Sequence, residues 1–221
     1  MQHPNEAGEA VGRSHIYLFF AGVFSQAPTP EGIAAIRNKS ILQEMEGHPE
    51  NPGYRELEHF VEEAGTISDL ADVLTAEFTQ LFVLPMGIRP YESVYLDKDQ
   101  RLGGKVTIAV KNFYENAGME FLPTCLDTAD HIGMELEFMG RLTALEAEGW
   151  TQGSASSLSR ILDLERDFLS SHLGRWASAL SDRIREEGTV AFYRAMALLM
   201  KGFVEEDLRY LESLKVSAAL K

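Results

Sequence analysis

Hydrophobic residues recur along most of this chain at the three- and four-residue spacing of amphipathic helices. One stripe follows Gly65 and Thr66, and longer stripes cover the segments from Ser154 to Glu187 and from Thr189 to about Leu214. The first stripe consists of Ile67, Leu70, Leu74, Phe78, Leu81 and Phe82. Neither the alternation of a strand nor a hairpin turn or internal repeat is convincing in this sequence. The pattern therefore predicts an all-α, single-domain helical bundle.

Shorter helices are predicted where turn residues flank apolar segments. They cover residues 13–26, 30–46, 54–64 and 105–117. Thr29 and Pro30 favour a helix start, and Gly118 suits the C-cap of the fourth of these helices. Residues 1–12 are polar, contain glycine and have no hydrophobic period, so we expect them to be disordered. One helical domain is then expected over residues 13–221.

Residues 84–104 form a long stretch without a helical period. It is interrupted by Pro85, Gly87, Pro90, Gly103 and Gly104. Tyr91, Val94 and Tyr95 argue against disorder, because side chains of these types anchor a loop to a surface. Loops of this length inside a compact domain are more often functional or disordered than idle. We therefore expect an ordered loop across one end of the bundle.

The stretch from Leu122 to Leu142 combines a helix start with clustered acidic residues. Its second half is amphipathic, and the oxygens of Asp127, Thr128 and Asp130 are suited to cap the first turn. Glu135 follows within two turns, and carboxylates near a helix N-terminus are favoured by the helix dipole. Capping explains the acids but leaves His131 unexplained. The simplest interpretation is a capped core helix whose histidine is merely hydrogen-bonded.

Composition narrows the class of partner. The formal net charge is −14, which argues against nucleic acid and permits attraction to basic partners. The single cysteine, Cys125, cannot form a disulfide or a cysteine-based zinc site within one chain, so a reducing cytoplasm is the natural setting. The apolar run from Ile16 to Phe24 is too short to span a bilayer.

Common enzyme motifs are absent: the chain has no G-x-G-x-x-G, Walker loop, H-E-x-x-H or G-x-S-x-G. Asp127, Asp130, His131 and Glu135 are compatible in principle with a metal site or an acid–base pair, which leaves open a metal-dependent or small-molecule helical enzyme. The set lacks a second histidine and a nearby nucleophile. We therefore expect no enzyme activity, catalytic residue, metal or cofactor. A helical adaptor for another basic partner also remains open.

A peptide-binding interpretation uses the same residues. Carboxylates recognise guanidinium groups through charge-assisted and often bidentate hydrogen bonds. An acidic cluster beside a loop of proline, tyrosine and leucine suits a peptide that carries both arginines and an apolar stretch. Twin-arginine signal peptides have this composition.

Three ordered motifs resemble the TorD/DmsD/NarJ family of redox-enzyme maturation chaperones. The segment from Asp130 to Met139, DHIGMELEFM, resembles the DH-x-x-x-E-L-E-F-M signature of that family. The segments Glu77–Phe82, with Pro85 and the following Pro90–Tyr95, and Phe168–Trp176 agree with it in the correct order. The resemblance extends roughly from Leu70 to Leu214.

The resemblance implies a cytoplasmic, all-helical chaperone that is not an enzyme. Such chaperones bind the twin-arginine leader, and often the body, of a molybdenum-cofactor oxidoreductase catalytic subunit and hold it back from export until the cofactor is inserted. The implied peptide-binding residues are Asp127, Asp130, His131, Glu135, Leu81, Phe82, Pro85, Pro90, Tyr91, Glu92 and Ser93. His172 and Trp176 match a family motif, but their periodicity indicates structural support. No nucleic acid partner and no stable membrane insertion is expected, and a homodimer is compatible with the sequence. Client and subgroup stay unassigned, because Val83-Leu84-Pro85 and Thr128-Ala129 depart from the pattern.

Overall fold

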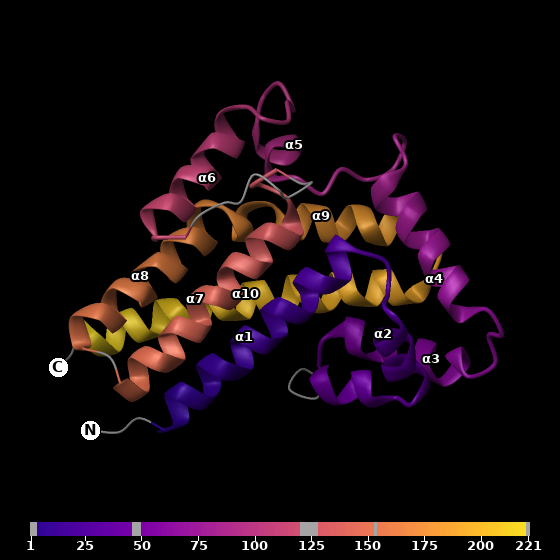
Figure 1. The fold of residues 1–221 in the computed structure, drawn as a ribbon, viewed down its shortest axis with the longest axis horizontal. Coiled ribbons are helices and arrows are strands. Elements are labelled where there is room, and N and C mark those ends of the chain that lie inside the picture. Colours follow the sequence, from indigo (N-terminus) through magenta and orange to yellow (C-terminus); the bar gives the residue numbers. More distant parts are fainter. Residues whose placement is uncertain (1–3, 46–49, 120–127, 153, 220–221) are drawn as a thin grey trace. The chain divides into compact units, whose positions relative to one another are not determined.

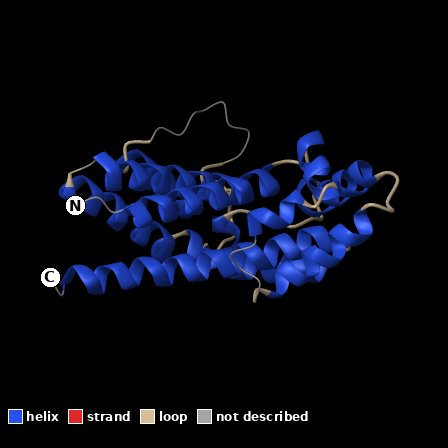
Figure 2. Cartoon of the chain, turned by 90° about the horizontal axis from the view of Figure 1, so that it is seen from below, coloured by secondary structure: helices blue, strands red, loops and turns tan. Residues whose placement is uncertain are grey.

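The computed structural model describes residues 4–45, 50–119, 128–152 and 154–219. The elements are α1 (Pro4–Ser25), α2 (Pro30–Arg37), the 3-10 helix η1 (Ser40–Met45), α3 (Pro52–Ala64), α4 (Leu70–Phe78), the π-helical turn η2 (Thr79–Val83), α5 (Glu92–Leu96), α6 (Lys105–Asn116), α7 (Ile132–Gln152), α8 (Ala155–Ser171), α9 (Leu173–Glu187) and α10 (Ala191–Ala219). Helices account for every regular element of the described residues (Figures 1 and 2), apart from one isolated β-bridge between Tyr91 and His131. The predicted all-α fold is confirmed.

The chain forms two compact units, called unit 1 and unit 2 below. Unit 1 consists of residues 1–22, 91–176 and 204–221. Unit 2 consists of residues 23–90 and 177–203. The division falls within α1, α9 and α10, so these three helices are continuous through it. None of the described helices has both the length and the apolar composition that a membrane span requires.

Helix α1 begins at Pro4, inside the segment 1–12 that was expected to be disordered. Ala7 and Ala10 are buried and are followed at helical spacing by the buried Ser14 and Tyr17. The sequence pattern did not predict this first part of α1, because alanine and serine give a weak hydrophobic signal. Small residues of this kind nevertheless allow two helices to pack closely.

The aromatic core of unit 1 joins α6, α7 and α8. The Tyr114 and Phe138 rings lie 4.4 Å apart between centroids, and the Phe138 and Phe168 rings lie 4.7 Å apart. Gly140 allows α1 to approach α7, because a Cβ there would meet the Leu18 side chain at 2.8 Å. Close-packed rings of this kind contribute more than their buried area alone.

Unit 2 is built from α2, α3, α4 and the adjoining part of α10. Gly53 allows α3 to lie directly on α10, because a Cβ there would be 2.6 Å from the carbonyl oxygen of Ala195. The buried Glu77 accepts hydrogen bonds from the backbone N–H groups of Thr189 and Val190, just before α10 begins. This carboxylate satisfies amides that otherwise lack partners at a helix start.

Three predicted helices are interrupted. The helix expected over residues 30–46 ends at Arg37 and is followed by the separate 3-10 helix η1, with Lys39 at a φ of +65° between them. The helix expected around Ile67–Phe82 becomes α4 followed by the π-helical turn η2, whose last hydrogen bond runs from the Leu84 N–H to the Thr79 oxygen at 3.0 Å. The helix expected from Ser154 to Glu187 is broken at His172, where φ is −127° and ψ is −101°. The stripe alone did not predict the last two breaks, because the hydrophobic period continues through both.

The predicted long loop at residues 84–104 is described throughout and contains the short helix α5. Gly87 lies against η2, because a Cβ there would be 2.5 Å from the Leu81 oxygen. The Ile88 N–H donates to the same oxygen at 2.6 Å. The loop is therefore anchored by its own hydrogen bonds at the Leu81 end.

Candidate functional site

His131 caps the start of α7. Its Nδ1 accepts a hydrogen bond from the backbone N–H of Gly133 at 3.1 Å. An accepting ring nitrogen carries no proton, so in the neutral ring the proton lies on Nε2. Asp130 was expected to cap this turn, but its Oδ2 accepts from the Ser93 N–H at 3.0 Å and its Oδ1 accepts from the Thr128 hydroxyl at 2.7 Å. The histidine that capping left unexplained is therefore the capping side chain.

The segment Tyr91–Ser93 is attached to the start of α7 by main-chain bonds. The Glu92 N–H donates to the Asp130 carbonyl oxygen at 2.9 Å, beside the bridge between Tyr91 and His131. The Tyr91 and His131 rings meet edge-on with centroids 5.1 Å apart. Asp130 thus receives hydrogen bonds from two successive residues of the loop, which fixes the loop to the helix start.

Glu92 faces His172 in the interior of unit 1. The His172 Nδ1 lies 3.1 Å from Oε1 and 3.0 Å from Oε2 of Glu92. This contact joins α5 to the junction between α8 and α9. The break between α8 and α9 at His172 is what places the ring beside α5. The sequence had assigned this histidine to structural support, and the structure puts it in direct contact with a predicted binding residue.

Glu135 is a fully buried carboxyl group. Its Oε2 accepts a hydrogen bond from the Trp176 indole N–H at 3.0 Å. Its Oε1 has no hydrogen-bond partner among the described residues. Burial, followed by the charge of nearby Glu92, raises the pKa of Glu135 well above its ordinary value. Burial and the neighbouring charge therefore both favour the neutral form of this carboxyl group.

The described members of the predicted site in unit 1 come together around the start of α7. Asp130, Glu135 and Ser93 are 0% exposed, Glu92 is 2% exposed and His131 is 5% exposed, whereas Tyr91 is half-buried. We call Glu92, Asp130 and Glu135 the acidic cluster. It is internal in this conformation.

The other predicted binding residues lie elsewhere. Leu81, Phe82, Pro85 and Pro90 belong to unit 2, and Asp127 lies outside the described residues. Leu81 is buried in η2, Phe82 is half-buried and Pro85 is exposed. π-Helical turns are rare overall, and they occur often at functional sites. The placement of Leu81 and Phe82 in such a turn therefore fits their prediction as binding residues.

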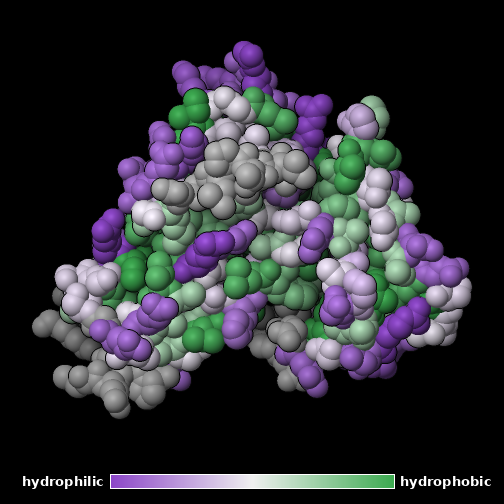
Figure 3. All heavy atoms as spheres, viewed as in Figure 1, coloured by the Kyte–Doolittle hydropathy of each residue, from purple (hydrophilic) through white to green (hydrophobic). Residues whose placement is uncertain are grey.

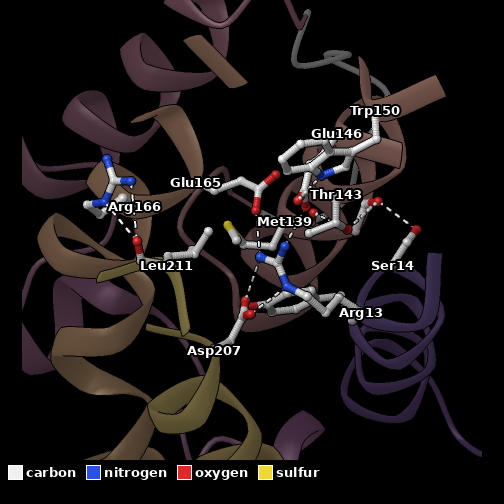
Figure 4. A network of polar contacts seen from close by, with 12 residues as sticks. Arg13, Ser14, Met139, Thr143, Glu146, Trp150, Glu165, Arg166, Asp207 and Leu211 are labelled. Atoms are coloured by element: carbon white, nitrogen blue, oxygen red, sulfur yellow. Dashed lines mark hydrogen bonds and ion pairs between the residues drawn. The ribbon is translucent and has the colours of Figure 1, made fainter. Parts of the chain in front are cut away.

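Sequence reasoning missed a second buried polar group, which Figure 4 shows around Arg13. The Arg13 guanidinium donates to the carboxylates of Glu146, Glu165 and Asp207 over 2.5–3.0 Å. All four side chains are buried. Burial raises the pKa of Glu165 to about 8, despite the opposing charge of Arg13. We call these four residues the Arg13 cluster.

A signal for the Arg13 cluster does exist in the sequence. Asp207 lies between Val204 and Leu211 on the apolar stripe of the last helix, and Glu165 lies between Leu162 and Phe168 on its own stripe. A charged residue at a core-facing position requires an opposite charge nearby. Reading these acids as interruptions of the stripes would have predicted a buried cation.

The described residues contain no group of three or more His, Cys, Asp or Glu side chains arranged to hold a metal ion.

The acidic cluster contains two carboxyl groups hydrogen-bonded by Trp176 and His172, and a third bonded by the loop backbone. Such a desolvated cluster is suited to a cationic ligand, because charge-assisted hydrogen bonds to guanidinium are strong where water is excluded.

The described residues combine an all-helical fold with a buried acidic cluster at the start of α7. A family model described as nitrate reductase delta subunit matches residues 49–182, which is more than half of the 221 residues. The chain therefore belongs to this family, the one that its three motifs resemble.

Several curated relatives are similar to this chain over nearly its full length. The chaperone protein TorD of Vibrio cholerae is 26% identical over 208 residues, which cover 91% of this chain and 93% of the relative. The chaperone protein TorD of Aeromonas salmonicida is 28% identical over 211 residues, covering 94% of each chain. These relatives are named chaperones, and the chain is a maturation chaperone of this family and not an enzyme.

A solved structure is similar in fold. It is the crystal structure of a proposed redox enzyme maturation protein from Archaeoglobus fulgidus, with a TM-score of 0.54 and 20% sequence identity. The match covers 87% of this chain and 93% of the other. At this identity the likeness establishes the fold alone.

Proposed function

We propose that this chaperone acts in the cytoplasm on the catalytic subunit of a molybdenum-cofactor oxidoreductase. It binds the twin-arginine leader of that subunit, its body, or both, assists insertion of the cofactor and prevents premature export. The proposal combines family membership with the chemistry of the acidic cluster, since a leader of this class carries arginines followed by an apolar stretch.

The observation that carries the proposal is Glu135. Its carboxyl group is fully buried, has one oxygen without a partner among the described residues and has a raised pKa. Two further acids, Glu92 and Asp130, lie in the same cluster, with His172 hydrogen-bonded to Glu92. A guanidinium group entering this cluster supplies positive charge and a donor for the Glu135 oxygen that has none.

In this conformation the cluster is closed, so the leader requires an opening. Two backbone bonds, from the N–H groups of Glu92 and Ser93 to Asp130, hold the covering segment in place. We propose that the leader displaces this segment. Tyr91 and Glu92 belong to this segment and move with it, so Asp130 and Glu135 at the start of α7 are the acids that the leader meets first.

A conservative pair of variants tests the site. Glu135→Gln retains the shape and the acceptor for Trp176 but cannot become an anion, whereas Glu137→Gln alters a half-buried acid two residues away that pairs with Arg141. In calorimetric titration with a synthetic leader peptide, we expect Glu135→Gln to weaken binding about tenfold, because it removes one charge-assisted bond. We expect Glu137→Gln to match the wild type. Equal affinity of wild type and Glu135→Gln would remove Glu135 from the site.

Two further measurements test what is recognised. A leader whose two arginines are replaced by lysines should bind more weakly, because ammonium groups cannot form the planar bidentate pair. Binding should also release a proton and strengthen with rising pH, since Glu135 has to lose its proton to become the anion. Capture of partners from the source organism, followed by mass spectrometry, would identify the client. Capture of an unrelated protein alone would contradict the client class.

A further inference from the structure

The loop between α5 and α6 carries an unusual group of cations. Lys98, Arg101 and Lys105 lie within eight residues, are exposed and form no ion pair with any described residue. Some exposed cations elsewhere pair along their own helices, as Lys111 does with Glu115 and Arg141 with Glu137. Asp97 and Asp99 lie in the same loop, so the three cations give it a small positive excess in a chain with 34 acidic and 20 basic residues.

The same loop forms a surface hollow of about 740 Å³. Every residue from Leu96 to Val106 except Gln100 contributes to its lining. Leu96, Leu102 and Val106 give this lining an apolar component, and Leu102 is 46% exposed. Ile108, on the next turn of α6, is 55% exposed. Figure 3 shows hydrophilic and hydrophobic residues side by side at the top of the view, where this loop lies.

The shape of the hollow is fixed by the loop itself. The Gly103 N–H donates to the Thr107 hydroxyl at 3.1 Å, and the Asp99 N–H donates to Oδ1 of Asp97 at 3.1 Å. Gly103 has a φ of +74°, a conformation that glycine adopts without strain. The carboxylate of Asp97 is thus used inside the loop, whereas the three cations extend from a preformed frame. Preformed surfaces bind with a smaller loss of conformational entropy.

We propose that this hollow, lined by residues 96–106, docks an acidic peptide segment that also carries apolar side chains. The carboxylates of the segment pair with Lys98, Arg101 and Lys105, and its apolar side chains cover Leu102 and Val106. An acidic peptide fits better than an anionic bilayer or nucleic acid, because a chain of net charge −14 is repelled by an extended anionic surface. This surface is separate from the acidic cluster, binds the opposite charge and does not depend on the leader-binding proposal.

The test uses a fluorescein-labelled peptide of Glu-Glu-Leu repeats and the full chain, followed by fluorescence anisotropy. The variant K98E/R101E/K105E should lower the affinity about tenfold, since three partly screened charge pairs become repulsive. The control variant K39E/R55E/R209E makes the same change in net charge with exposed cations outside the loop, and it should change the affinity by less than about threefold. An equal loss in both variants would overturn the proposal, because net charge alone would then explain binding.

Further binding measurements distinguish an acidic peptide from other classes of ligand. L102S keeps the charge and should weaken binding of the Glu-Glu-Leu peptide but not of a Glu-Glu-Ser peptide. Phosphatidylglycerol vesicles should bind no more tightly to wild type than to K98E/R101E/K105E, and inorganic phosphate should not displace the peptide. Binding of vesicles that is lost in the triple variant, with no peptide binding, would replace the peptide by a lipid surface. Circular dichroism melts of all variants should agree, because the substituted cations and Leu102 contribute exposed surface.

Discussion

Trp176 donates its indole N–H to Oε2 of Glu135 over 3.0 Å, which joins the beginning of α9 to the first turns of α7 inside unit 1. Both side chains are fully buried. The Trp176 ring also packs on Tyr95 with centroids 5.3 Å apart. Trp176 therefore connects the acidic cluster to Tyr95 of α5, in the loop at residues 84–104.

Replacing Trp176 with Phe should destabilise the protein by about 1–3 kcal/mol, because Oε2 of Glu135 then loses its donor in a buried site. Urea unfolding followed by far-ultraviolet circular dichroism measures this change. The smaller ring contributes as well, so the bond is isolated by a double-mutant cycle with Glu135→Leu. Additive effects of Trp176→Phe and Glu135→Leu would mean that the hydrogen bond contributes nothing to stability.

Stability should fall as the pH rises from about 5 to 8. Burial raises the pKa of Glu135 well above its ordinary value, and it raises the pKa of Glu165 from 4.5 to about 8. Between the unfolded and folded pKa values the folded chain holds protons that the unfolded chain releases, so each rise in pH favours unfolding. The change is complete once the pH passes the folded pKa.

Urea midpoints at several pH values measure this dependence. Glu135→Gln is permanently neutral and should flatten the curve, whereas Glu137→Gln should leave its slope unchanged. A curve that rises over this range in the wild type would show that both carboxyl groups are ionised in the folded chain.

Most of the helices could be predicted from the sequence because each apolar stripe repeats over several turns. Thr29 is an example of a local signal that was sufficient: its hydroxyl accepts from the Gly32 N–H at 3.2 Å, at the predicted start of α2. The break at His172 was not predictable in this way. The hydrophobic period passes through it, and the ring is held by Glu92, a residue that is distant in the sequence.

The candidate site was predicted in its residues but not in its geometry. The motif indicated that Asp130, His131 and Glu135 belong together, but not that they lie in the interior. Their burial depends on the Tyr91–Ser93 segment, and a pairing between residues about forty positions apart has no periodic signal. The role of His131 as the cap also follows from one backbone contact that residue type alone does not favour.

The Arg13 cluster should be sensitive to loss of its single cation. Arg13→Met leaves Glu146, Glu165 and Asp207 buried without a positive partner, and removing one partner of a buried ionic group costs about 3–5 kcal/mol. Urea unfolding should therefore show a large drop in midpoint. Arg183→Gln breaks an exposed pair with Glu187 on one helix and should cost about 0.5 kcal/mol or less.

The contribution of charge can be separated from that of packing in this cluster. Asp207→Leu in the Arg13→Met background removes one of the acids left without a partner, so part of the lost stability should return. If the double variant is less stable than Arg13→Met alone, packing around Asp207 and its bond from the Tyr17 hydroxyl matter more than the surplus charge.

Gly87→Ala should disturb η2, the turn that carries Leu81 and Phe82. The added Cβ would lie 2.5 Å from the Leu81 oxygen and 2.6 Å from the Gln80 oxygen, and both are backbone atoms that cannot rotate away. Forcing the loop off η2 should cost about 1–3 kcal/mol of folding stability.

Gly12→Ala is the matched control, because its Cβ would meet no atom within 4 Å on an exposed face of α1. There the substitution should stabilise the helix by about 0.5–1 kcal/mol. Opposite shifts of the two urea midpoints are the expected result, and equal midpoints would mean that the loop adapts to the alanine without moving η2.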